Sequence, residues 1–195
     1  MIRLAVIERG RGWRAWMLRP VLRWFFGQPT PGLVKVLLYR YEFFGKPVGR
    51  YGHAALRGPS RWSVGERELF AAVVSAGNRC GYCARVHGAI ARLLLGARVV
   101  DDVLHGGALD CVNQGMAAMV PFLRRLSAGP DQVTASDVLA LRCAGLDDKQ
   151  IMDAVHTAVL LEICNRVVNA LGVESMGADQ NQRAARFLLR HGYDR

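Results

Sequence analysis

Apolar residues recur every three or four positions along most of the chain, the spacing that places them on one face of an α-helix. The clearest run opens at Ser63, which has Glu66 three residues later, as in a helix-starting capping box. This run continues through Phe70 to Val74. The pattern therefore predicts a helix that begins just after Ser63.

A second helix is expected immediately afterwards. Gly77 and Asn78 interrupt the first pattern, because glycine accepts the left-handed conformation that closes a helix and asparagine is a good N-cap residue. Apolar residues at helical spacing then resume near Arg79 and continue to Leu94. The sequence thus predicts two antiparallel helices joined by a short turn.

The rest of the chain repeats the same features. Helical runs follow at Val99–Leu104, at Gly115–Leu126, after a capping box at Thr134–Asp137, and after Asp147 with Gln150. Pro130, Gly145 and Gly172 stand where breaks and C-terminal caps belong. Because the chain shows no sustained strand alternation, we expect an all-α bundle forming a single domain. Its 195 residues, 51% of them hydrophobic, suffice for one full core.

The most specific chemistry lies at the start of the second predicted helix. Cys80 and Cys83 form a C-x-x-C pair, and His87 follows one helical turn later. Residues at i, i+3 and i+7 share one helix face, so the two thiols and the imidazole should point the same way. Free backbone amides and the helix dipole favour a thiolate at this position. Glu68, on the preceding helix, is placed to fold back towards the thiols.

These residues resemble the core signature of the AhpD-like alkylhydroperoxidases, within the carboxymuconolactone decarboxylase superfamily. That signature is a Glu, eleven intervening residues and C-x-x-C-x-x-x-H, and it matches Glu68, Cys80, Cys83 and His87. Downstream, segments 145–151, 165–172 and 188–193 resemble peroxidase-related members, so the resemblance covers roughly residues 40–193. It implies an AhpD-like helical bundle with the C-x-x-C at the N-terminus of a core helix. Residues 62–195 would be the catalytic core, and residues 1–61 a basic helical arm and lead-in.

The resemblance also implies roles. Cys83 would be the thiolate that attacks the peroxide, Cys80 would resolve the sulfenic acid as a disulfide, and Glu68 with His87 would relay protons. The best-studied branch has a histidine directly before the second cysteine, whereas this chain has Tyr82, an auxiliary candidate. A phenol is a poor base near neutral pH, so the relay would be shortened.

Other uses of the cysteine pair are disfavoured. Structural zinc normally takes four ligands, and here one pair and one histidine stand without a second C-x-x-C. Ala84 follows Cys83, so the haem-attachment pattern fails. A thioredoxin-like fold would place the motif after a strand rather than between helices. Two alternatives to a peroxidase stay open: a non-catalytic redox sensor, and a lyase of the decarboxylase type, which does not depend on a C-x-x-C.

Two groups of residues outside the motif have simpler explanations. The three single cysteines lie in apolar helical contexts and are expected to be small buried hydrophobes: Cys111, Cys143 and Cys164. Asn165 and Arg166 interrupt a long apolar helix, and burying either unpaired would cost several kcal/mol (~2–7). We therefore expect this pair to anchor a hydrogen bond between helices or subunits.

The net charge of +10 is confined to the N-terminal part of the chain. Residues 1–61 contain twelve basic against two acidic residues, whereas residues 62–195 contain fourteen of each. Segment 13–26 interleaves arginine with large aromatic residues. We expect this arm to pack on a neighbouring subunit rather than on an anionic membrane surface, since exposed Trp and Phe usually find a protein partner. Nucleic acid is not an expected partner, because no binding motif accompanies the arginines.

The remaining expectations follow from cysteine usage and from the resemblance. An odd number of cysteines with one close pair fits a reducing cytoplasm, and neither a secretory signal nor a membrane-spanning run is expected. The resemblance implies a homo-oligomer, a trimer or hexamer, with no bound metal or organic cofactor. Its partners would be a small-molecule peroxide and an external dithiol reductant, a lipoyl-bearing or thioredoxin-like protein.

Overall fold

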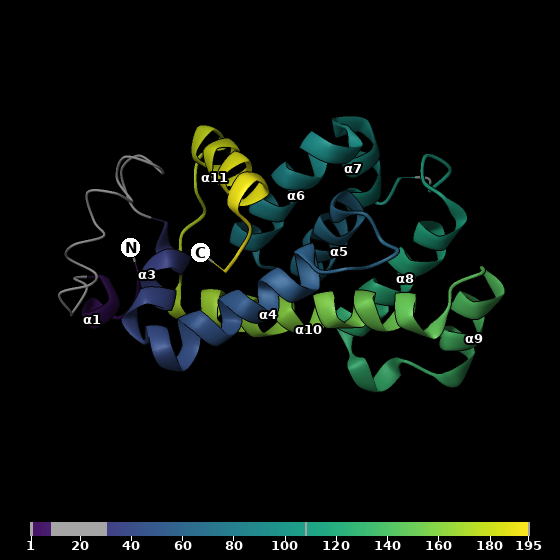
Figure 1. Ribbon diagram of the computed structural model, residues 1–195, viewed down its shortest axis with the longest axis horizontal. Coiled ribbons are helices and arrows are strands. Elements are labelled where there is room, and N and C mark those ends of the chain that lie inside the picture. The colour runs from purple at the N-terminus through teal and green to yellow at the C-terminus, as the bar shows by residue number, and fades with distance from the viewer. Residues whose placement is uncertain (1, 9–30, 108, 195) are drawn as a thin grey trace.

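The computed structural model describes residues 2–8, 31–107 and 109–194, which form helices and connecting segments without a strand among them (Figure 1). The all-α prediction is therefore confirmed for the described part of the chain. The elements are α1 (Ala5–Glu8), α3 (Gly32–Tyr39), the π-helix η1 (Tyr41–Gly45), α4 (Lys46–Arg57), α5 (Val64–Gly77), α6 (Gly81–Leu95), α7 (Ala97–Leu104), α8 (Gln114–Ala128), the 3-10 helix η2 (Pro130–Gln132), α9 (Ala135–Cys143), α10 (Asp148–Leu171) and α11 (Ala178–His191).

Side-chain caps fix where the central helices begin. The Ser63 side chain accepts from the Glu66 backbone N–H, while the Glu66 carboxylate accepts from the Ser63 backbone N–H, so α5 opens with the predicted capping box. Asp147 and Gln150 cap α10 in the same way. At the far end of α10, Gly172 adopts the left-handed conformation with φ 63°, as its position predicted.

The core is built around the hairpin of α5 and α6. These two helices make the most extensive contact in the fold, with α8 and α10 also packed on α5 and α11 packed on α6. Leu69 and Phe70 of α5 are fully buried, and Trp62 packs edge-on against Phe70 with ring centroids 4.9 Å apart. The Trp62 indole donates to the Gln150 carbonyl at 2.8 Å, which ties the start of α5 to α10. The α5–α6 hairpin is therefore held on several sides.

Both ends of the described chain pack on helices of this bundle (Figure 1). Near the N-terminus, the Arg3 guanidinium donates to the Ala170 carbonyl at 3.0 Å, so a cation meets the carbonyl end of α10. At the C-terminus, α11 crosses α6, and the residues that follow it return to α4, since the Tyr193 carbonyl lies beside Gly49. The C-terminal tail is thus brought to the helices that carry the predicted site.

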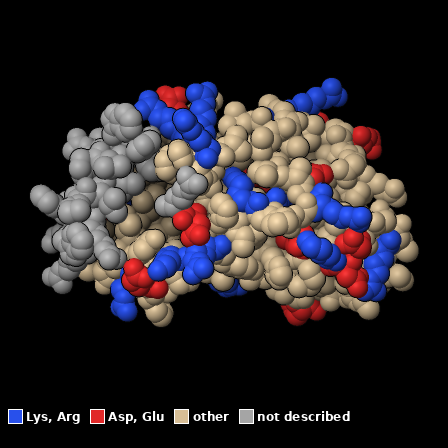
Figure 2. Space-filling view, viewed as in Figure 1, with Lys and Arg blue, Asp and Glu red and all other residues tan. Residues whose placement is uncertain are grey.

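Basic and acidic side chains lie close together at several places on the face shown in Figure 2. Arg61 pairs with Asp147 at 2.8 Å and Lys149 with Asp153 at 2.9 Å, so basic residues from both parts of the chain have acidic neighbours. The arginine and aromatic segment 13–26, with its proposed packing role, lies outside the described residues. Within the described part, no helix is long and apolar enough to cross a membrane.

The prediction for the single cysteines was wrong at two of three positions. Cys111 and Cys143 are exposed, because one lies in the turn after α7 and the other at the end of the short helix α9, whereas Cys164 is buried inside α10.

Asn165 is buried and accepts from the Ser75 hydroxyl at 3.2 Å, so the predicted interhelical hydrogen bond is made between α10 and α5. Its neighbour Arg166 is exposed and lies 3.9 Å from Glu162.

Candidate active site

The turn between α5 and α6 places the cysteine pair at a helix start. Arg79 takes the left-handed conformation with φ 52°, and the Cys80 backbone N–H donates to the Ser75 carbonyl at 2.8 Å. The chain therefore turns sharply just before α6, which begins at Gly81 rather than at the predicted Arg79. Cys80 is the N-cap residue, and Cys83 lies in the first turn.

The two thiols are buried and interact directly. Cys80 is fully buried and Cys83 is 2% exposed. A hydrogen bond from the Cys83 side chain is the largest of the effects that lower the pKa of Cys80 to about 7, with further lowering from the backbone amides of Cys83 and Tyr82. The same hydrogen bond, together with burial, raises the pKa of Cys83 well above its ordinary value. The pair thus holds one proton on Cys83 and favours a thiolate at Cys80.

A third thiol belongs to the same region. Cys164 of α10 is buried, and this burial, with a smaller contribution from the charge on Cys80, raises the pKa of Cys164 to about 12. Its thiol also contributes to raising the pKa of Cys83. Cys164 therefore stays protonated beside the pair.

Glu68 and His87 form a buried carboxylate–imidazole pair across the α5–α6 interface. Glu68 Oε2 lies 2.7 Å from His87 Nδ1, and the Glu68 side chain is fully buried. Burial raises the pKa of Glu68, but His87 and Arg57 lower it by more, so the carboxylate stays ionised. A carboxylate on Nδ1 favours the tautomer that leaves Nε2 with a free lone pair.

Two further residues bind the other carboxylate oxygen. Arg57, at the end of α4, places a guanidinium nitrogen 2.6 Å from Glu68 Oε1, and the Tyr193 hydroxyl donates to the same oxygen at 2.8 Å. The sequence did not indicate either residue as part of the site. Arg57 lies outside the spaced motif, and Tyr193 is 125 residues from Glu68, although the resemblance of segment 188–193 to relatives was a signal that the tail matters.

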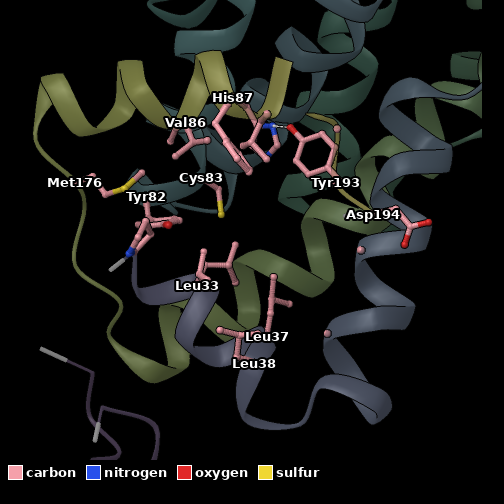
Figure 3. Close-up of a pocket in the computed structure, with 18 of the residues that line it drawn as sticks. Leu33, Leu37, Leu38, Tyr82, Cys83, Val86, His87, Met176, Tyr193 and Asp194 are labelled. Carbon is pink, nitrogen blue, oxygen red and sulfur yellow. Dashed lines mark hydrogen bonds between the residues drawn. The ribbon is translucent and has the colours of Figure 1, made fainter. Parts of the chain in front are cut away.

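A cavity of about 260 Å³ reaches these groups from outside (Figure 3). Cys83 and His87 lie on its wall, with the sulfur of Cys83 pointing into the space between Tyr82 and Leu33. Most of the remaining lining is apolar and comes from α3, α6, α11 and the segments next to them: Leu33, Val34, Leu37, Leu38, Val86, Met176, Phe187 and Leu188. Cys80 is not part of the wall. The cavity therefore gives access to one of the two thiols.

Tyr82 lies on the cavity wall beside Cys83 and is buried. Burial, with a smaller effect of Cys83, raises the pKa of Tyr82 above its ordinary value. The phenol is thus protonated at neutral pH, and it can donate a hydrogen bond but cannot act as a base. It does not replace the histidine of the best-studied branch in that respect.

The residues around the cavity do not resemble a metal centre. Within the part of the chain that the structure describes, no group of three or more His, Cys, Asp or Glu is placed to hold a metal ion. Glu68 is already engaged by Arg57, Tyr193 and His87, so its oxygens are occupied. The arrangement suits thiol chemistry assisted by an imidazole.

Comparisons with known proteins agree with this architecture. The model of the carboxymuconolactone decarboxylase family matches residues 44–101, which contain Glu68, Cys80, Cys83 and His87. Among curated proteins, none matches the chain significantly.

Two solved structures share the fold over nearly its whole length. An uncharacterized peroxidase-related protein from Silicibacter sp. TM1040 is 21% identical, with a TM-score of 0.75 over 94% of this chain and 95% of that chain. An uncharacterized peroxidase-related protein from Ralstonia eutropha JMP134, described as an alkylhydroperoxidase AhpD core, is 22% identical, with a TM-score of 0.73 over 94% and 96%. Residues 44–101 thus match the carboxymuconolactone decarboxylase family, and the chain shares the fold of these two peroxidase-related proteins.

Proposed function

We propose that this protein is a thiol-dependent peroxidase that reduces organic hydroperoxides, and hydrogen peroxide, through Cys83 and Cys80. One observation carries the proposal: Cys83 and His87 share the wall of an apolar cavity, and Cys80 lies behind Cys83 as a second thiol with a pKa of about 7. An accessible sulfur, a neighbouring imidazole and a buried partner thiol are the parts that peroxide reduction by a dithiol needs.

The first step consumes the peroxide. The Cys83 thiol gives its proton to His87 Nε2, and the resulting thiolate attacks the terminal peroxide oxygen. The O–O bond breaks, Cys83 becomes a sulfenic acid, and the departing alkoxide takes the proton back from His87 to leave as an alcohol. Sulfur is oxidised by two electrons and the peroxide is reduced by two.

The second step closes the disulfide. The Cys80 thiolate attacks the sulfenic sulfur of Cys83, forming the S–S bond and expelling hydroxide, which solvent protonates to water. Because the Cys80 thiolate forms near neutral pH, it is ready as soon as the sulfenic acid appears. Access through the cavity, rather than the pKa values of the thiols, assigns the first reaction to Cys83, because Cys83 lies on the cavity wall and Cys80 does not.

Glu68 supports this chemistry by orienting the imidazole. The carboxylate is ionised, buried and hydrogen bonded to Arg57, Tyr193 and His87, so it does not need to exchange protons itself. Holding Nδ1–H of His87 leaves Nε2 to accept and return the proton of Cys83. This role is narrower than the proton relay that the sequence suggested.

The lining of the cavity favours a substrate with an apolar group. Its volume of about 260 Å³ is close to the lower end of small-molecule sites, roughly 300 Å³. Leu33, Leu37 and Phe187 offer an apolar surface beside the sulfur of Cys83, so an alkyl or aryl hydroperoxide would gain binding energy that hydrogen peroxide cannot. We expect organic hydroperoxides to be the better substrates.

The oxidised pair would need an external dithiol. With Cys80 buried and Cys83 reached through the cavity, a slender lipoyl arm fits the access better than the surface of a folded thioredoxin. We propose a lipoyl-type reductant and no bound organic cofactor.

Turnover tests the proposal against a redox sensor. With excess cumene hydroperoxide and dihydrolipoamide, the wild type should consume many equivalents of peroxide per chain, and Cys83→Ser and Cys80→Ser should not. Cys143→Ser, which removes an exposed thiol on α9, is the matched control and should keep full turnover. Oxidation that stops after one equivalent would favour the sensor, and turnover that survives in Cys83→Ser would reject the mechanism.

A further inference from the structure

The C-terminal tail lies directly on α4. After α11, Gly192 takes a left-handed φ of 72°, and a Cβ there would come within 2.6 Å of His53 Nδ1. A Cβ on Gly49 would lie 2.9 Å from the Tyr193 carbonyl oxygen, and one on Gly52 would lie 3.5 Å from Tyr193 Cβ. These glycines therefore allow the close approach that carries the Tyr193 side chain towards the site.

The Tyr193 ring packs against Arg57 and His87, the other two residues that bind Glu68. The Arg57 guanidinium is 5.0 Å from the ring centroid, and the His87 ring is stacked at 25° with centroids 6.2 Å apart. The residue as a whole is half-buried, and its hydroxyl points towards His87 (Figure 3). Packing of this kind fixes the direction in which the hydroxyl points.

The Tyr193 hydroxyl binds one oxygen of the Glu68 carboxylate and leaves the other oxygen to His87. It donates to Oε1 at 2.8 Å, the oxygen that Arg57 also binds, and its own oxygen lies 3.4 Å from His87 Nδ1. Burial and the Glu68 charge raise the pKa of Tyr193 well above its ordinary value, so the phenol remains a donor. Oε2 is left to His87 Nδ1.

We propose that Tyr193 is a positioning residue: by holding Glu68 Oε1, it keeps Oε2 on His87 Nδ1 and so keeps His87 Nε2 unprotonated towards the cavity. This inference rests on the proposed function, in which Nε2 takes the proton of Cys83. It makes Tyr193, in the C-terminal tail, part of the working site.

The test is Tyr193→Phe, which keeps the ring and its packing and removes the hydroxyl. Nitrogen-15 NMR of the imidazole, assigned with His87→Gln and recorded where the ring is neutral, reports the tautomer directly. Wild type should show Nδ1–H with a free Nε2. The variant should show a mixture of tautomers, and its thiol oxidation by cumene hydroperoxide should slow about fivefold, the worth of one hydrogen bond.

Tyr51→Phe is the matched control, because its hydroxyl donates to the His156 carbonyl at 3.1 Å, away from the cavity. It should leave the His87 tautomer and the oxidation rate unchanged. An unchanged tautomer in Tyr193→Phe, or an Nε2–H tautomer in wild type, would overturn the inference. The NMR result does not require activity, so absence of peroxide turnover in wild type would reject the proposed function separately.

Discussion

Glu68 Oε2 and His87 Nδ1 lie 2.7 Å apart, and the carboxylate that makes this contact is completely buried. An ionised carboxylate in such a place is stable because the Arg57 guanidinium lies 2.6 Å from its other oxygen. The stability of the fold and the orientation of the imidazole therefore depend on the same side chain.

Replacing Glu68 with Gln should lower both the stability of the fold and the rate of thiol oxidation. The variant leaves the Arg57 charge buried without its counter-charge, which should lower the free energy of unfolding by about 3–5 kcal/mol. Oxidation of the thiols by cumene hydroperoxide should slow at least about tenfold, because the imidazole loses its anionic partner. Urea unfolding and stopped-flow oxidation measure the two effects.

Glu162→Gln serves as the control for that change. Glu162 accepts from the Asn78 side chain at 2.7 Å at a partly exposed position, and an amide oxygen can take over this role. Glu162→Gln should lower the free energy of unfolding by less than about 1 kcal/mol. If Glu162→Gln lowered the unfolding free energy and the oxidation rate as much as Glu68→Gln does, the loss could not be assigned to the contacts of Glu68 with Arg57 and His87.

The pH dependence of thiolate formation tests the coupled thiols. The pKa of Cys80 lies at about 7, below the ordinary 9.0, so thiolate absorbance in reduced wild type should rise between about pH 6 and 8, where an ordinary thiol is still protonated. Cys80→Ser should lose this transition. Cys83→Ala should shift it upwards, because this variant removes the hydrogen bond from Cys83, which is the largest cause of the lowering. A transition that stays near pH 7 in Cys80→Ser would place the thiolate elsewhere.

Filling the cavity should discriminate between substrates. Leu37→Trp adds bulk to the apolar wall, so the rate with cumene hydroperoxide should fall about tenfold or more while the rate with hydrogen peroxide changes little. Leu139→Trp, at a site 58% exposed on α9, is the control and should alter neither. Equal slowing of both peroxides in Leu37→Trp would show that the apolar wall does not select the substrate.

Two glycines one turn apart on α4 test the docking of the tail. A Cβ at Gly52 makes an ordinary 3.5 Å contact, so Gly52→Ala should be neutral or stabilise α4 by up to about 1 kcal/mol. A Cβ at Gly49 would meet the Tyr193 carbonyl oxygen at 2.9 Å and must displace it, so Gly49→Ala should slow thiol oxidation. Thermal unfolding and stopped-flow oxidation would show the contrast, and equally active variants would mean that the tail position is not needed.

The local signals in the sequence anticipated much of the fold. The capping boxes at Ser63 and Asp147 are formed as predicted, because they depend on residues three positions apart. The start of α6 was misplaced by two residues because the left-handed Arg79 is not a preference that its residue type reveals.

Long-range contacts could not be predicted in the same way. Spacing brought Cys80, Cys83, Glu68 and His87 into one candidate site, and the structure places all four together. Tyr193 reaches Glu68 from a remote tail, whose path depends on glycines in α4 and after α11. Exposure of Cys143 likewise depends on how little of α9 the neighbouring helices cover, as only Leu141 is buried there.

The most direct test of the central claim is stopped-flow oxidation of the reduced protein by cumene hydroperoxide, followed by intact mass and peptide mapping. Wild type should react rapidly and lose the mass of two hydrogens, mapped to a Cys80–Cys83 disulfide. Cys80→Ser should stop at a sulfenic acid on Cys83, and Cys83→Ser should hardly react. Slow oxidation that is insensitive to Cys83→Ser, or a product on another cysteine, would contradict the proposal that Cys83 and Cys80 form the peroxidase centre.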